Sequence, residues 1–482
     1  MEAVSVVKVS RISAAAEEGA PPRKPISLTF YDTFWMPLPP IQRLFLYLTD
    51  LPAAAVVDRF KASLSLTLPR FYSLAGKLDY LPEVDDVVIA FSADDGVDLV
   101  EALCEGGDLR RLVDAADHDV EMFMKLVPVT DVKELPAPVF TLQVTEFPGQ
   151  GVAVGFSVHH LAIDGKAVWQ FIEAWTAECQ RLAGAAVQVT SPAAMLMNRS
   201  VLDFPGAVQV AKHYRDLLTP NLPSVSKSSL SLSLALFLFL SLTTLEWGVY
   251  VQLRNEKLPI PRDDGLKAAR RTFTLSAAAV EALRAEGAGG GGAAPPTAFV
   301  ALAAHGWISA LKAKLVPADE QDAALCFFLD LRPHLDPPVP ANFFGNCQKP
   351  CAVYAKAADL LAAGGLKVAV AAIEKEIAAC LKDPLVDSKS WLEKLFKLPR
   401  PRRVGVQAWP DLRVYETADF GFGRPARVEL VSMNHDGDVV LVAAREEEGG
   451  VQASVALSAV YMDAFAALFV APREWDPLAF EK

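Results

Sequence analysis

The sequence predicts an α/β or α+β protein with two sheet-containing halves, and three observations support this class. The chain has 482 residues, more than one hydrophobic core usually organises, so two domains are expected. Hydrophobic residues make up 52% of the chain and charged residues 22%, so most of it should fold. Segments with the period-two pattern of strands alternate along the chain with segments whose apolar residues recur at helical spacing.

In the first half, the segments 87–93, 139–147 and 151–158 are expected to be strands. The last of them places four apolar side chains on one face, namely Val152, Val154, Phe156 and Val158. A helix should follow, because apolar residues then recur at helical spacing at Val168, Phe171, Ile172, Trp175, Cys179 and Leu182.

The second half repeats this order. Strands are expected at 271–276, 323–331, 437–446 and 450–457, the last two as a pair, and helices at 277–286 and 297–314. Proline-rich text before residue 226 and after residue 257 marks a linker. The expected division is therefore an N-terminal half at 1–218, a crossover at 219–268 and a C-terminal half at 269–482.

The crossover contains an anomalous apolar stretch, "SSLSLSLALFLFLSLTTL" at 228–245. Its length reaches the lower limit for a transmembrane helix, but its Ser/Leu alternation suits a strand better and basic flanks are weak. It also resembles the translation of a pyrimidine-rich tract near an intron end. A retained intron at 226–254, a genuine apolar insert and a membrane segment are therefore three alternatives, and the membrane segment is the least favoured.

The formal net charge of −12 disfavours a nucleic-acid binder or an anionic-membrane binder, since both need an excess of Lys and Arg. The N-terminus has no long apolar stretch of the kind found in secretory signals, so we expect a cytoplasmic protein, acting as a monomer. The six cysteines are scattered without a CxxC pair and read as buried, reduced thiols: Cys104, Cys179, Cys326, Cys347, Cys351 and Cys380.

The stretch "GFSVHHLAIDG" joins the strand at 151–158 to the following helix. Strand alternation should send His159 and His160 to opposite faces, so only one can face a given cleft. Asp164 is a good helix N-cap, and His160 could be either a packed polar residue or a general base, because imidazole has a pKa of about 6.5. A zinc site is disfavoured, since adjacent strand residues diverge and no third strong ligand is visible.

"HHLAID" together with the late "DFGFG" resembles the signature of the BAHD acyltransferases, plant enzymes that transfer acyl groups from coenzyme A (CoA) thioesters. The usual late motif is DFGWG, and Phe422 stands here in place of its tryptophan. "FFGNC" is similar to the YFGNC of the branch that acylates flavonoid or phenolic glucosides, often with malonyl groups. Further similar stretches, absent only from 226–254, are "LTFYDTFWMPLPPIQRLFLY", "LSLTLPRFYSLAGKL", "TAFVALAAHGW" and "DLRPHLDPPVPANFFGNC".

The resemblance implies two chloramphenicol-acetyltransferase-like domains with a channel between them. His160 would deprotonate an acceptor hydroxyl, and acyl-CoA would serve as co-substrate, with no bound cofactor and no metal. Asp164 would pair with Arg332 of "DLRP" rather than touch substrate. The acyl group would be malonyl or hydroxycinnamoyl, and the acceptor a phenolic or flavonoid glucoside.

The resemblance also nominates supporting residues. Candidates for oxyanion stabilisation or the channel wall are Asn346, Gln407 and Trp409. The turn residues Asp419, Gly421 and Gly423 should be structural, as glycine permits tight turns. An anionic CoA needs a basic patch, for which the candidates are Arg271, Arg400, Arg402 and Arg403.

Two other functions stay open at this point. A condensation domain of peptide synthetases shares the HHxxxDG pattern that runs from His159 to Gly165. A catalytically impaired or purely binding protein is the other, because the insert at 226–254 could damage the product.

Overall fold

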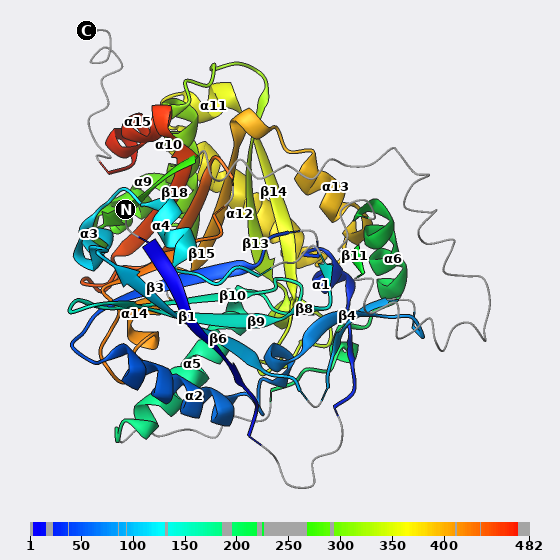
Figure 1. Cartoon of the computed structure of the whole chain (residues 1–482). Helices are drawn as coiled ribbons and strands as arrows, with labels where there is room; N and C mark the ends of the chain where they lie inside the picture. Colours follow the sequence, from blue (N-terminus) through cyan, green and yellow to red (C-terminus); the bar gives the residue numbers. More distant parts are fainter. Residues whose placement is uncertain are drawn as a thin grey trace.

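A computed structural model describes residues 3–470 apart from 16–22, 37, 85, 93, 131–133, 186–194, 219–223, 226–267, 290–293, 410–411 and 434. Two six-stranded mixed sheets organise the fold, one in each half of the chain (Figure 1). This is the two-domain arrangement that the sequence predicts.

The first sheet lies lower in Figure 1 and is built mainly from the N-terminal half. Its strands run in the order β1 (Ala3–Ile12), β6 (Val97–Glu105), β9 (Phe140–Phe147), β10 (Gly151–Val158), β3 (Ile41–Leu48) and β16 (Arg427–Leu430). Only the β6–β9 pair is parallel. The central strands β9 and β10 are almost wholly buried because both of their faces are covered.

The second sheet belongs to the C-terminal half. Its strands run in the order β12 (Ala268–Leu275), β18 (Val451–Ser458), β17 (Asp438–Ala443), β15 (Arg403–Trp409), β13 (Asp322–Asp330) and β14 (Gln348–Lys356). A smaller sheet has the order β2 (Ile26–Ser27), β5 (Asp86–Ala90), β4 (Lys77–Leu81) and β8 (Ala137–Pro138), and β11 (Ser224–Val225) pairs with β7 (Glu134–Leu135).

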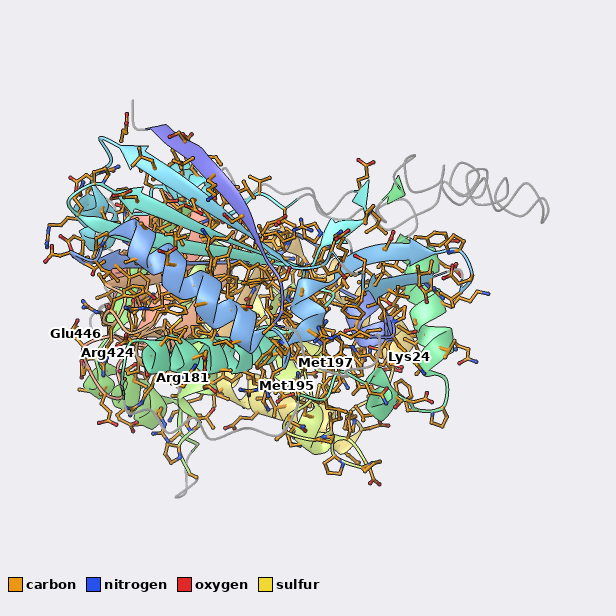
Figure 2. The ribbon with its side chains drawn as sticks, turned by 60° about the horizontal axis from the view of Figure 1, so that its bottom comes forward. Lys24, Arg181, Met195, Met197, Arg424 and Glu446 are labelled. Atoms are coloured by element: carbon orange, nitrogen blue, oxygen red, sulfur yellow. The ribbon has the colours of Figure 1, made fainter. Side chains whose placement is uncertain are left out.

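Helices cover both main sheets. On the N-terminal side they are α1 (Phe30–Thr33), α2 (Ala53–Thr67), α3 (Leu109–Asp114), α4 (Val120–Lys125), α5 (Gly165–Leu182) and α6 (Ala207–Leu218). On the C-terminal side they are α9 (Ala277–Gly287), α10 (Ala298–Ala313), α11 (Ala357–Leu361), α12 (Gly365–Lys382), α13 (Trp391–Phe396) and α15 (Ala459–Val470). The short helix α14 (Val414–Thr417) follows β15 in the sequence but packs on α5 and β16. Figure 2 shows α2 and α5 packed side by side beneath the first sheet, with Arg181 near the end of α5.

Strand β16 comes from the C-terminal half but completes the edge of the first sheet. It pairs with β3 in a register that places Leu430 opposite Arg43. The residues just before it join the same core, since Tyr415 and Phe420 are buried within the N-terminal hydrophobic cluster. The two halves of the chain are therefore interlocked, because the C-terminal half contributes one strand to the first sheet.

The strands and helices expected from local periodicity are present, including α5, α10 and the β17–β18 pair. Most of the expected crossover at 219–268, with the anomalous stretch 228–245, lies outside the described residues. Among the residues that are described, no helix is both long enough and apolar enough to cross a membrane.

Candidate active site

His160 lies at the start of the loop between β10 and α5, on the wall of a cavity of about 420 Å³. Its ring stacks on Trp35, with the ring centroids 3.7 Å apart and the planes inclined by 5°. The stack fixes the plane of the imidazole. Nδ1 of His160 is buried and has no hydrogen-bond partner within the described part of the chain. The residue itself is partly exposed, so its ring can meet a molecule bound in the cavity.

Residues of both halves line the cavity. The N-terminal half contributes Trp35, Arg43 and His160, among others. Four phenylalanines of the C-terminal half supply apolar and aromatic surface: Phe299, Phe327, Phe328 and Phe396. A histidine on the wall of such a concave, mostly apolar site is an obvious candidate for proton transfer.

The two histidines of the loop have separate surroundings. His159 is fully buried and does not line the cavity, as strand alternation predicts for one of the pair. Burial lowers the pKa of His159 to about 3 and that of His160 to about 4. Both rings are therefore neutral at pH 7, and a neutral imidazole is the form that can accept a proton.

Asp164 has three structural partners. It caps α5 by accepting a hydrogen bond from the backbone N–H of Ala167 at 3.0 Å. It also forms a buried ion pair with Arg332, with 2.9 Å between Nη2 and Oδ2, and accepts the N–H of Cys347 at 3.0 Å. The N-cap and the arginine pair coexist at one carboxylate, which joins the histidine loop to the C-terminal half.

A second buried network, which sequence reasoning missed, supports the same loop. Arg199 donates to the carbonyl of Ala162 at 2.8 Å and pairs with Asp32 at 3.3 Å. Asn346 donates to the carboxylate of Asp32 and to the carbonyl of His160, both at 3.0 Å. Asp32 and Trp35 lie in the "FYDTFW" stretch, but nothing local in that motif indicates that it meets His160.

Of the three residues nominated for oxyanion stabilisation or the channel wall, the structure places only one on the cavity lining that it describes. Gln407 lines the cavity from β15. Asn346 is fully buried, and its amide group donates to Asp32 and to main-chain carbonyls beneath the loop, away from the cavity wall. Trp409 ends β15, and its side chain lies outside the described part of the structure.

The late motif forms a tight turn away from the cavity. Asp419 accepts the backbone N–H groups of Gly421 at 2.8 Å and Gly423 at 3.1 Å. Gly421 and Gly423 have φ values of +83° and +102°, a backbone conformation that glycine adopts more readily than residues with a side chain. The turn packs on α2 and α5, and Arg59 of α2 donates to the carbonyl of Gly421 at 2.9 Å. Figure 2 labels Arg424, which follows the turn in the sequence, and Arg181 of α5.

The nominated arginines do not converge on one patch. Arg271 pairs with Asp117 at 2.5 Å and with Asp463 at 2.9 Å, and Arg402 forms a two-pronged pair with Asp319 at 2.6 and 2.8 Å. Arg403 alone of the four is found among the described residues that line the cavity. The side chain of Arg400 lies outside the described residues.

Two interlocked mixed sheets with a histidine cavity between them form the two-domain, chloramphenicol-acetyltransferase-like fold. The crystal structure of vinorine synthase has this fold, with a TM-score of 0.66 and 17% sequence identity over 96% of each chain. The fold class predicted from the sequence is confirmed.

The family model described as "Transferase family" matches residues 4–229 and 249–470. The chain belongs to this family, the BAHD acyl-CoA-dependent acyltransferases, as its motifs predict. Membership of this family favours acyl transfer from CoA over the condensation-domain function that the HHxxxDG pattern left open. The gap in the match, 230–248, falls inside the anomalous segment 226–254; the origin of that segment stays a prediction.

Two relatives from Arabidopsis thaliana illustrate the range of the family. "Phenolic glucoside malonyltransferase 2" is 28% identical, over 92% of this chain and 93% of its own. "Coumaroyl-CoA:anthocyanidin 3-O-glucoside-6''-O-coumaroyltransferase 2" is 27% identical, over 92% of each chain.

Proposed function

We propose that this enzyme transfers an acyl group from a CoA thioester to a hydroxyl group of a phenolic glucoside, with His160 as the general base. The placement of His160 carries the proposal. Its ring is held by Trp35 at the wall of a cavity shared by the two halves, and the residue is partly exposed there. The acceptors named in the two relatives are also glucosides.

The reaction needs only proton transfer and acyl exchange. His160 takes the proton of the acceptor hydroxyl as the oxygen attacks the thioester carbonyl. The tetrahedral intermediate collapses by breaking the carbon–sulfur bond, and the proton passes from His160 to the CoA thiolate. Gln407, which lines the cavity, is the side-chain amide nominated to stabilise the oxyanion.

Arg43 favours malonyl over hydroxycinnamoyl as the acyl group. It lines the cavity, is 3% exposed, and its Nε has no hydrogen-bond partner among the described residues. Burial lowers its pKa to about 10, so the guanidinium stays charged at neutral pH. A malonyl carboxylate would give this buried charge a two-pronged partner. The phenylalanines of the cavity suit the aromatic acceptor.

The test is product formation from malonyl-CoA, acetyl-CoA or hydroxycinnamoyl-CoA with flavonoid glucosides, followed by mass spectrometry. His160→Ala should lower kcat by about 10²–10⁴-fold while the folded protein is retained. His213→Ala, at a half-buried histidine of α6 away from the cavity lining, is the matched control and should keep full activity. Activity of His160→Ala within tenfold of the natural chain would refute the role of His160.

Deleting 226–254 tests the remaining alternative, in which the full chain is a catalytically impaired or purely binding protein. If the full chain is inactive and the shortened chain transfers acyl groups, the full-length form is an impaired product. If neither form transfers from any donor, the proposed function is wrong.

A further inference from the structure

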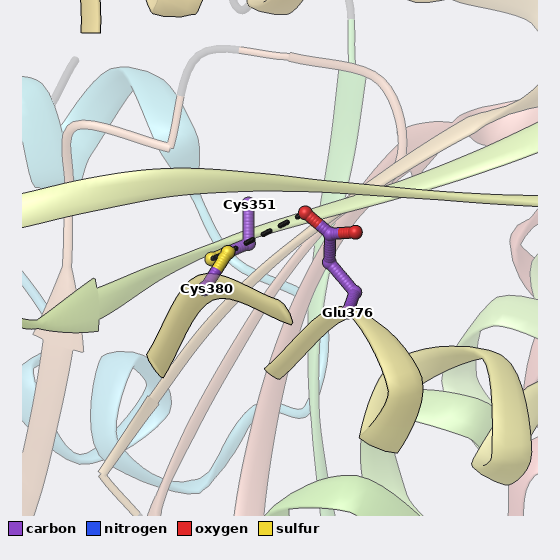
Figure 3. Close-up of side chains that lie close together, drawn as sticks. All are labelled: Cys351, Glu376 and Cys380. Atoms are coloured by element: carbon purple, nitrogen blue, oxygen red, sulfur yellow. Dashed lines mark hydrogen bonds between the residues drawn. The ribbon is translucent and has the colours of Figure 1, made fainter. Parts of the chain in front are cut away.

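Figure 3 shows a group of two thiols and one carboxylate that lie close together. None of the three residues is among those that line the histidine cavity. Cys351 is on β14, while Glu376 and Cys380 are on α12. Their sulfur and carboxylate oxygen atoms all lie within 4.8 Å of one another. In the described part of the chain, no other set of three His, Cys, Asp or Glu side chains converges in this way.

The local geometry explains the convergence. Glu376 and Cys380 are four residues apart on α12, so both side chains lie on one face of the helix. That face packs against β14, where Cys351 meets it. The two sulfur atoms are 3.2 Å apart, and Sγ of Cys380 is 3.4 Å from Oε1 of Glu376.

The group borders a second cavity, also of about 420 Å³. Both thiols are buried, with exposed fractions of 0% for Cys351 and 2% for Cys380, and Glu376 is half-buried. Lys349, the neighbouring cation on β14, donates to the carbonyl of Asp383 at 3.3 Å and lies over the ring of Trp391. Its ammonium group is thus held by other partners, while Cys351, Glu376 and Cys380 all border the cavity.

We propose that Cys351, Cys380 and Glu376 bind a Zn²⁺ ion, with water from the cavity as the fourth ligand. Binding releases two protons, one from each thiol, and joins the metal to two thiolates and one carboxylate. A structural or regulatory metal at this place would tie β14 to α12. It is independent of the acyl-transfer chemistry at His160.

Distances support a d¹⁰ cation. Zn–S bonds of about 2.3 Å and Zn–O bonds of about 2.0–2.2 Å in a tetrahedron place sulfur and oxygen about 3.5 Å apart. The observed 3.4 Å between Cys380 and Glu376 meets this. The two sulfurs would have to separate by about 0.5 Å from their present 3.2 Å, a small rotation of side chains that border a cavity.

A disulfide would use only part of the group. It would require closure to about 2.05 Å and an external oxidant, and it would leave the carboxylate without a role. A cation engages all three side chains at once, so the metal is the occupant that the constellation favours.

The experiment is a zinc titration of the full chain after treatment with a chelator and a phosphine reductant. Competition with a chromophoric chelator should reveal one tightly bound equivalent, which the Cys351→Ser/Cys380→Ser double variant lacks. Glu376→Gln should weaken binding at least tenfold. Co²⁺ in place of Zn²⁺ should give a sulfur-to-metal charge-transfer band that disappears in the double variant.

Cys104→Ser/Cys179→Ser is the matched control, because it removes two other buried thiols on β6 and α5. It should keep the bound equivalent. If the natural chain binds no thiol-dependent zinc, or if the control loses it equally, the proposal is overturned. Wild-type protein that forms a Cys351–Cys380 disulfide in air, two hydrogens lighter by mass, and takes up no zinc after reduction would also overturn it. If the Cys351→Ser/Cys380→Ser variant misfolds, the zinc affinity of Glu376→Gln, a change at a half-buried position, decides whether the proposal holds.

Discussion

The two motifs that identify this enzyme, "HHLAID" and "DFGFG", use the same device for different ends. In each, an aspartate accepts backbone N–H groups and fixes a sharp change of chain direction. Asp164 is fully buried and pairs with Arg332, whereas Asp419 is only half-buried and holds a turn rich in positive φ.

The surroundings explain the difference. The histidine loop lies where the two halves meet, and the carboxylate of Asp164 is buried there. Because a buried charge needs a partner, Asp164 pairs with Arg332 of the other half. The late turn packs on α2 and α5, outside the cavity lining. A shared motif signature can therefore combine one segment at the cavity wall with another that holds the scaffold together.

Replacing each aspartate by asparagine gives the sharpest contrast. Asp164→Asn should cost about 3 kcal/mol or more of stability, because it leaves Arg332 with one fewer buried partner. Asp419→Asn should cost less than about 1 kcal/mol, since asparagine also accepts backbone N–H groups in turns. Denaturant unfolding of both variants tests this. Equal losses would contradict the distinction between the two motifs.

Acid should destabilise the histidine loop. The folded pKa of His160 is lowered to about 4 by burial, below the value of about 6.5 expected in the unfolded chain. The unfolded state therefore binds more protons between these values, so stability falls as the pH is lowered from about 6.5 towards 4.

The loss attributable to His160 should be on the order of 2 kcal/mol. Melting temperatures between pH 8 and 4 measure it, and His160→Gln should flatten part of the curve. A curve for the natural chain that is level from pH 7 to pH 4.5 would argue against a neutral, buried ring.

Gly421→Ala should destabilise the turn by about 1–2 kcal/mol without changing kcat, because a side chain is disfavoured at φ +83°. An added Cβ would also lie 3.1 Å from Cβ of Ala183. Gly423→Ala separates the two causes, since its φ is +102° but the added Cβ would meet nothing within 4 Å. Thermal melts and initial rates measure both. A fall in kcat would place the turn closer to the chemistry than the geometry does.

Phe422→Trp should have the smallest effect, within about 0.5 kcal/mol of the natural chain. Phe422 is only half-buried and makes an edge contact with Tyr47, with centroids 4.8 Å apart. The same melts and rates check it. A large gain in activity would show that the missing indole N–H matters.

Local periodicity was sufficient to predict the elements that carry the site. The strand at Gly151–Val158 and the helix at Gly165–Leu182 each follow from their own residues. The pairing of β16 with β3 could not be predicted in this way, because a strand of four residues does not specify a partner distant in sequence.

The site shows the same limit. His160 and Asp164 are visible as a spaced motif, and the Asp164–Arg332 contact was expected only through the family resemblance. The Trp35 stack and the meeting of Cys351 with Cys380 are long-range packing events. The arginines Arg271 and Arg402 were nominated for their charge, but their acidic partners come from distant segments.

The pairing of β16 with β3 joins the two halves independently of the crossover that links them in sequence. Loss of β16 would undo this joint and uncover a sheet edge beside the cavity.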